Sequence, residues 1–152
     1  MLRGIAAASR QPETAARKTF NPSVPVQVLM LLLFLAVCFG TAALGAQWTL
    51  SSVNGWYQTL AKPTWTPPDW VFGPVWSVLY LIMAVAAWLV WRQSEGSGAR
   101  TEWFLFGTQL LLNAAWSGIF FALRSPGGAF VEIVLLWTTI AATMLAVWTR
   151  HR

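Results

Sequence analysis

The chain has 152 residues, of which 57% are hydrophobic and only 10% are charged, and its mean hydropathy is +0.55. This balance excludes an ordinary soluble domain, in which about 25% of the residues carry a charge. The net charge of +5 does not indicate nucleic-acid binding, because the basic residues stand at the ends of apolar segments and set membrane orientation there. We therefore expect an all-α integral membrane bundle that contacts membrane lipid and binds no nucleic acid.

Residues 1–25 contain several arginines and a single acidic residue, Glu13. Their apolar residues do not recur at a regular spacing long enough to form a core, so we expect a mobile, basic tail. A transit peptide, which is also rich in arginine and poor in acids, is the alternative. The apolar run at residues 26–46 would cross about 30 Å as a helix, which is the thickness of the hydrocarbon layer. A cleaved signal peptide competes with this first span, but its apolar core would be shorter.

Small residues dominate the second half of the first span, and Thr41 and Gly45 have the small-xxx-small spacing. Such a face either lets a neighbouring helix approach closely or leaves space for a ligand. Cys38 in the same span is the only cysteine, which excludes an internal disulfide and a cysteine metal cage. We expect Cys38 to be a small packing residue.

Segment 48–72 combines tryptophans with prolines. Because proline fixes φ and lacks a backbone donor, most of this segment cannot be a regular helix or a central strand. It is predicted to be a stiff, aromatic-lined loop. Its amphipathic rings are expected at a membrane surface or over a ligand, and they are Trp56, Tyr57, Trp65 and Trp70.

Three further spans follow, at residues 73–91, 103–123 and 129–148. In the second span, Trp76, Tyr80, Met83 and Ala87 share one helical face. A turn of only a few residues separates the last two spans, so they must run antiparallel side by side. Four spans place the tail, the turn after residue 92 and the basic end at 150–152 on one side of the membrane.

That side holds most of the basic residues, whereas the other side has only Lys62 and Arg124. The positive-inside rule therefore predicts that both termini are cytoplasmic and that the tryptophan loop lies outside. Helical spans favour an inner membrane over an outer membrane, in which spanning proteins are usually barrels, and the outer membrane stays the alternative.

Two amides and two rings form one stripe in the third span, where Gln109, Asn113, Trp116 and Phe120 recur at i, i+4, i+7 and i+11. Amides facing lipid are costly, so the stripe should face the bundle interior. There the amides either bond across to other helices or meet the polar groups of a ligand. Glu132, near the start of the fourth span, either reaches the surface to pair with Arg124 or lies at a pocket mouth.

The sequence lacks the combinations of residues that form common catalytic sites. His151 is the only histidine and lies at the end of the chain, which argues against a Ser-His-Asp triad, a histidine zinc site and a haem ligand within the bundle. We expect no metal, no covalent cofactor and no catalytic residue. The many indoles and few titratable groups instead favour holding a flat, apolar small molecule by stacking and shape.

Three stretches resemble the tryptophan-rich sensory protein family, also called the translocator protein or peripheral benzodiazepine receptor family. They are WYQTLAKPTWTPPDWVFGPVWSVLYLIMA at 56–84, QLLLNAAWSGIFF at 109–121 and AFVEIVLLW at 129–137. The resemblance implies a helical bundle that binds porphyrins and other tetrapyrroles, sterols and benzodiazepine-like drugs. It also implies a pocket capped by the loop between the first two helices.

The resemblance assigns residues to that pocket by position. The implied ligand-binding set is Trp65, Trp70, Trp76, Tyr80, Gln109, Asn113, Trp116 and Trp137. A second set, at the pocket mouth or with a structural role, is Tyr57, Lys62, Asp69 and Glu132.

The chain departs from the family in supplying four spans, because members of the family have five. The fifth helix normally forms a wall of the pocket and carries a tryptophan proposed to act in porphyrin breakdown. We expect it to be replaced by a homodimer or another subunit, or else the pocket to be degraded. The resemblance therefore favours a membrane receptor that reports oxygen, light or stress through tetrapyrrole binding. A light- or oxygen-dependent porphyrin-degrading enzyme and a tetrapyrrole carrier are the alternatives.

Overall fold

The structure is a computed structural model that describes residues 22–94 and 100–150. Four helices in these residues are long and apolar enough to cross a membrane, and no strand occurs among them. They are α1 (Val24–Val53), α2 (Phe72–Gln93), α3 (Arg100–Ser117) and α4 (Pro126–Arg150). The predicted all-α membrane bundle of four spans is confirmed. The expected mobile tail and basic C-terminus fall largely at 1–21 and 151–152, outside the described residues.

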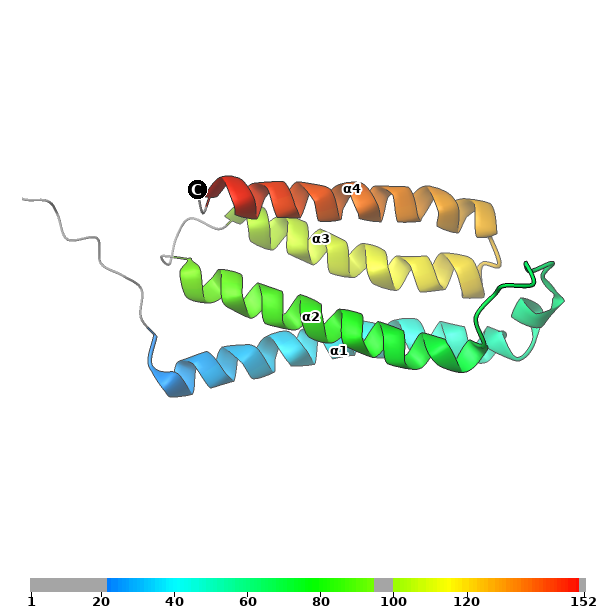
Figure 1. Ribbon diagram of the computed structural model, residues 1–152, viewed down its shortest axis with the longest axis horizontal. Helices are drawn as coiled ribbons and strands as arrows, with labels where there is room; N and C mark the ends of the chain where they lie inside the picture. Colours follow the sequence, from blue (N-terminus) through cyan, green and yellow to red (C-terminus); the bar gives the residue numbers. More distant parts are fainter. Residues whose placement is uncertain (1–21, 95–99, 151–152) are drawn as a thin grey trace, which may run out of the picture.

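The helices form a series in which α2 packs against α1, α1 against α3, and α3 against α4. Figure 1 shows that helices consecutive in the chain run antiparallel, as predicted for α3 and α4, so the packed pair α1 and α3 runs parallel. The start of α1 and the end of α4 lie at the same end of the bundle, and the tryptophan loop lies at the opposite end (Figure 1). The helices α2 and α4 stand at the two ends of the series.

The first helix is longer than predicted, because it continues through residues 47–53, where the sequence suggested the start of the loop. This part has no proline, and its hydroxyls are satisfied within the bundle. Thr49 Oγ1 donates to the Gly45 carbonyl at 3.1 Å, and Ser52 Oγ donates across to the Phe121 carbonyl at 2.9 Å. The irregular loop therefore begins only at Asn54. It contains two short 3₁₀ turns, η1 (Trp56–Thr59) and η2 (Asp69–Val71).

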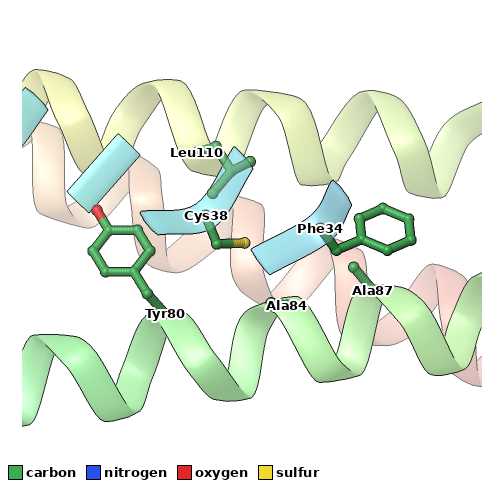
Figure 2. Packing of buried hydrophobic residues seen from close by; sticks show 6 residues of the cluster. All are labelled: Phe34, Cys38, Tyr80, Ala84, Ala87 and Leu110. Carbon is green, nitrogen blue, oxygen red and sulfur yellow. The ribbon is translucent and has the colours of Figure 1, made fainter. Parts of the chain in front are cut away.

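The core lies where α1 meets α2 and α3. Figure 2 shows Phe34 and Cys38 of α1 between Ala84 and Ala87 of α2 and Leu110 of α3. The two alanines bring α2 close to α1, and Cys38 is fully buried as the small packing residue expected from the sequence. The predicted face of α2 is confirmed as its inner face.

Two local features distinguish the loop end of the bundle: a close contact between α1 and α3, and a change of helix type at the end of α3. A Cβ added at Gly45 would come within 3.0 Å of Ser117 Oγ, so α1 and α3 approach closely there, as the small-residue spacing allowed. Directly after Ser117, α3 widens into the π-helical turn η3 (Gly118–Ala122). Such a turn displaces backbone carbonyls from regular α-helical bonding, and one of them, at Phe121, accepts the Ser52 hydroxyl.

Candidate functional site

A cleft of about 570 Å³ opens between the loop-side halves of α1 and α2. Alanines of α1 form one wall, the end of α3 contributes Trp116 and Ser117, and η3 contributes Phe121. The volume lies in the range of about 300–1,000 Å³ typical of small-molecule sites. The small residues of α1 therefore do both things that the sequence suggested, since Gly45 packs against α3 while its neighbours Ala42, Ala43 and Ala46 leave space.

Aromatic rings form the opposite side of this cleft. The Trp76 ring lies 6.0 Å from Tyr80 and 6.3 Å from Trp116, measured between ring centroids. Trp116 in turn stacks on Phe120 at 5.1 Å with an interplanar angle of 12°. Rings that support one another in this way present a rigid apolar surface to a ligand.

Tyr80 supplies the polar group nearest the core. Its side chain is only 4% exposed and lines the cleft, and its hydroxyl makes no hydrogen bond with any residue that the structure describes. Figure 2 shows this hydroxyl directed away from α2. The hydroxyl is not among the fully buried atoms without a partner in the described residues, so it is open to the cleft that Tyr80 lines. A ligand in the cleft can therefore exchange a hydrogen bond with it.

The loop is attached to the bundle by Tyr57, which is buried against Phe72, Phe120 and Phe121 at centroid distances of 5.9–6.3 Å. Lys62 Nζ lies 4.0 Å from the centre of the Tyr57 ring. Burial, and secondarily the charge of Asp69, raise the pKa of the Tyr57 hydroxyl, so it keeps its proton at neutral pH. Tyr57 thus anchors the loop.

Sequence reasoning missed Gln58, which joins the two ends of the loop. Its Nε2 donates to Asp69 Oδ2 at 2.6 Å, and its Oε1 accepts from Lys62 Nζ at 3.2 Å. Lys62 and Asp69 therefore brace the loop, and Asp69 also lines the cleft. Gln58 is an isolated polar residue in the sequence, and nothing in its spacing could have revealed this contact.

The loop tryptophans differ in position. Trp70 lines the edge of the cleft, although much of its side chain is exposed. Trp65 is 80% exposed and does not line the cleft. Trp137 is also remote from the cleft, because it lies on an outer face of α4 and is 73% exposed. The structure therefore brings Trp70, Trp76, Tyr80 and Trp116 together and leaves Trp65 and Trp137 outside.

Both amides of α3 are buried, as predicted, but neither lines this cleft. Asn113 Nδ2 donates to the Gln109 carbonyl of its own helix at 2.9 Å. Gln109 Nε2 reaches across to the thioether of Met83 on α2 at 3.2 Å. Gln109 instead lines a separate groove of about 820 Å³ between α2 and α4, with α3 as its floor.

Glu132 takes neither of the positions considered from the sequence. Its side chain is only 5% exposed, so it does not reach the surface, and neither carboxylate oxygen has a hydrogen-bond partner in the described part of the chain. It also does not line the cleft. The expected pairing with Arg124 is wrong, because Glu132 points into the packed bundle and Arg124 is exposed. No cluster of potential metal ligands occurs within residues 22–94 and 100–150.

Comparison with known proteins places this arrangement in a family. The model of the TspO/MBR family matches residues 33–152, which contain every residue that lines the cleft. The chain belongs to the TspO/MBR family. It is 40% identical over 124 residues to the tryptophan-rich protein TspO of Chlorobaculum tepidum, a match that covers 79% of this chain and 77% of that relative.

Other TspO/MBR relatives have sensory and translocator names. The tryptophan-rich sensory protein of Cereibacter sphaeroides is 38% identical over 117 residues, which are 77% of this chain and 70% of that protein. The human translocator protein is 44% identical over 93 residues, which are 60% of this chain and 55% of the human protein. The resemblance stated from the sequence motifs is thereby confirmed.

Proposed function

We propose that this TspO/MBR protein is a membrane receptor that binds a tetrapyrrole in the cleft between α1 and α2. The observation that carries the proposal is the Tyr80 hydroxyl, which has no hydrogen-bond partner among the described residues and lies in a largely apolar, ring-lined cleft. Trp76 and Trp116 offer faces on which a flat ring system can stack, and Tyr80 can hydrogen-bond to its polar edge. Sterol-like and benzodiazepine-like molecules are expected to compete for the same space.

Room for the ligand depends on the alanines of α1. Ala43 and Ala46 line the cleft and are exposed on the outer side of the bundle. A ligand can therefore enter sideways from the bilayer between α1 and α2, without displacement of the loop anchored by Tyr57. This route suits an apolar ligand, because such a molecule partitions into the hydrocarbon layer before it binds.

The test is a titration of purified protein with protoporphyrin in darkness, followed by tryptophan quenching. Tyr80→Phe should weaken binding about threefold to tenfold, the loss of one hydrogen bond. It should leave stability unchanged, because the hydroxyl has no partner among the residues that the structure describes. Ala46→Leu should abolish binding by filling the cleft. Ala86→Leu is the matched control, because Ala86 lines the other groove. Binding that is indifferent to both cleft variants would refute the proposal.

The same titration under light distinguishes a receptor from an enzyme. A receptor leaves the porphyrin absorption bands intact, whereas a porphyrin-degrading enzyme removes them in proportion to the protein added. Loss of the bands that depends on Trp76 or Trp116 would replace the receptor with the enzyme as the function of the cleft.

We also propose that both termini are cytoplasmic and that the tryptophan loop is outside. The start of α1 and the end of α4 share one end of the bundle (Figure 1), and the positive-inside rule assigns this basic end to the cytoplasm. A cysteine introduced at the exposed Thr64 should react with an impermeant maleimide from outside intact cells. Reaction only after the cells are opened would reverse the orientation.

A further inference from the structure

The groove between α2 and α4 is separate from the proposed receptor site, because it shares no lining residue with the cleft between α1 and α2. Its deep end is marked by the contact between Gln109 Nε2 and the Met83 thioether, which joins α3 to α2 at 3.2 Å. Its other end lies where α2 ends and α3 begins, and Gln93 and Glu102 line it there. The groove therefore opens toward the basic end of the bundle (Figure 1).

The length of the groove matches one leaflet of a bilayer. Along α2 it runs from Ile82 to Gln93, and along α4 from Ile140 to Trp148, which are about 16 Å and about 12 Å at 1.5 Å per residue. The hydrocarbon core of a bilayer is about 30 Å thick, so one leaflet contributes about 15 Å. A spanning helix would need walls about twice as long. These dimensions favour the acyl chain of a lipid from one leaflet.

The lining of the groove suits such a chain. Between the two ends it is apolar except for Thr143, whose hydroxyl donates to the Thr139 carbonyl of its own helix at 2.8 Å. Trp103 of the floor is held in place by stacking on Phe34, with 5.5 Å between the ring centroids. Trp148 lines the open end. Because tryptophan settles at the membrane–water interface, this end should lie at the depth of the lipid headgroups.

The exposed charges near the open end are positive. Arg92 directly precedes Gln93, and its guanidinium lies 4.6 Å from the centre of the Trp88 ring. Arg100 lies two residues before Glu102, and both arginines are exposed. Glu102 itself is only 6% exposed and already interacts within the protein. A headgroup at the open end therefore meets mainly positive charge.

We propose that the groove is a binding site for an anionic phospholipid from the leaflet at the basic end of the bundle. One acyl chain lies along the groove with its end near Gln109, and the exposed amide of Gln93 donates a hydrogen bond to an ester carbonyl of the lipid. Arg92 and Arg100 attract the phosphate, as basic residues beside a membrane helix attract anionic lipid. In the orientation proposed above this is the cytoplasmic leaflet, which is the anionic one. The bound lipid fills the space between α2 and α4.

Photolabelling of the full chain in liposomes tests the position of the chain. The probe is phosphatidylglycerol with a diazirine at the end of one acyl chain, diluted into phosphatidylcholine. Peptide mapping after irradiation should place adducts on Met83 and Ile140 at the deep end. With the diazirine next to the ester, the adducts should move to Val90 and Val147. Labelling of the exposed Leu33 on α1 to the same extent would overturn the proposal. A groove that stays unlabelled because a partner helix fills it would also overturn the proposal.

Filling the groove tests the site without disturbing the cleft. Ala86→Trp places an indole in the groove and should remove most of the groove adducts. Ala36→Trp, at an exposed position of α1 that lines neither cavity, is the matched control and should leave them unchanged. Ala46→Leu in the cleft should also leave them unchanged, so the receptor proposal and the lipid proposal can fail separately. Full labelling of the groove in Ala86→Trp would contradict the site.

Competition between lipids tests the charge of the headgroup. Unlabelled phosphatidylglycerol should displace the probe more effectively than phosphatidylcholine. Arg92→Gln and Arg100→Gln should each reduce this preference about fivefold, which is the attraction of one basic residue for an anionic membrane surface. Arg124→Gln, at an exposed position at the opposite end of the bundle, is the matched control and should have no effect. Equal displacement by the two lipids in the wild type would exclude an anionic lipid site.

Discussion

The contact between Gly45 and Ser117 allows a sharp test of how α1 and α3 are held together. A Cβ at position 45 would lie 3.0 Å from Ser117 Oγ, which is closer than ordinary van der Waals contact, and 3.4 Å from Ser117 Cβ. Gly45→Ala should therefore push α1 away from α3 or force the serine to another rotamer. At Gly40, five residues earlier on the same helix, an added Cβ would meet nothing within 4 Å.

The expected penalty follows from these distances. Overpacking of a well-packed contact costs about 1–3 kcal/mol, and a single methyl group that needs a shift of a few tenths of an ångström should lie at the low end, about 1 kcal/mol. Ser117→Ala removes the nearer atom and leaves only the 3.4 Å contact. The combination of Gly45→Ala with Ser117→Ala should therefore recover most of the stability, whereas Gly40→Ala should cost nothing.

The assay is the free energy of unfolding in mixed micelles, measured for the wild type, the three single variants and the Gly45–Ser117 double variant. A coupling energy near 1 kcal/mol between positions 45 and 117 is expected, because residues in direct contact do not contribute additively. Equal stability of Gly45→Ala and Gly40→Ala, or strictly additive losses in the double variant, would refute the close approach of α1 and α3 at this point.

Three further outcomes are expected from the buried polar groups. Ser52→Ala should lower the free energy of unfolding by about 1–2 kcal/mol, because it leaves the Phe121 carbonyl of η3 without its donor; denaturation of the variant in the same micelles measures this. Glu132→Leu should be as stable as the wild type or more stable, because it removes a buried carboxyl without a partner; a large loss would reveal an interaction of that carboxyl. Cys38 should resist maleimide in the folded protein and react once α1 separates from α2, so rapid labelling of the folded protein would contradict the packing in Figure 2.

The sequence alone was enough to predict the number and type of the membrane spans. Long apolar runs bounded by polar turns can be satisfied in lipid only as helices, and the short connection after α3 forces an antiparallel hairpin. The motifs around Trp65, Asn113 and Glu132 also identified the family. The burial of the α3 amides followed from the cost of placing them in lipid.

Which residues meet was decided by the tertiary structure. Gln109 and Trp116 lie on one stripe of α3, yet they line different cavities, because the groove follows the second half of α2 beside α4, whereas the cleft follows the first half of α2 beside α1. Periodicity reports which face of a helix is inward, but not which neighbour that face meets at each depth. The exposure of Trp65 and the burial of Glu132 likewise depend on the position of a loop and of a helix end in the fold. Those positions are set by packing contacts between residues far apart in the sequence, such as the contacts of Tyr57.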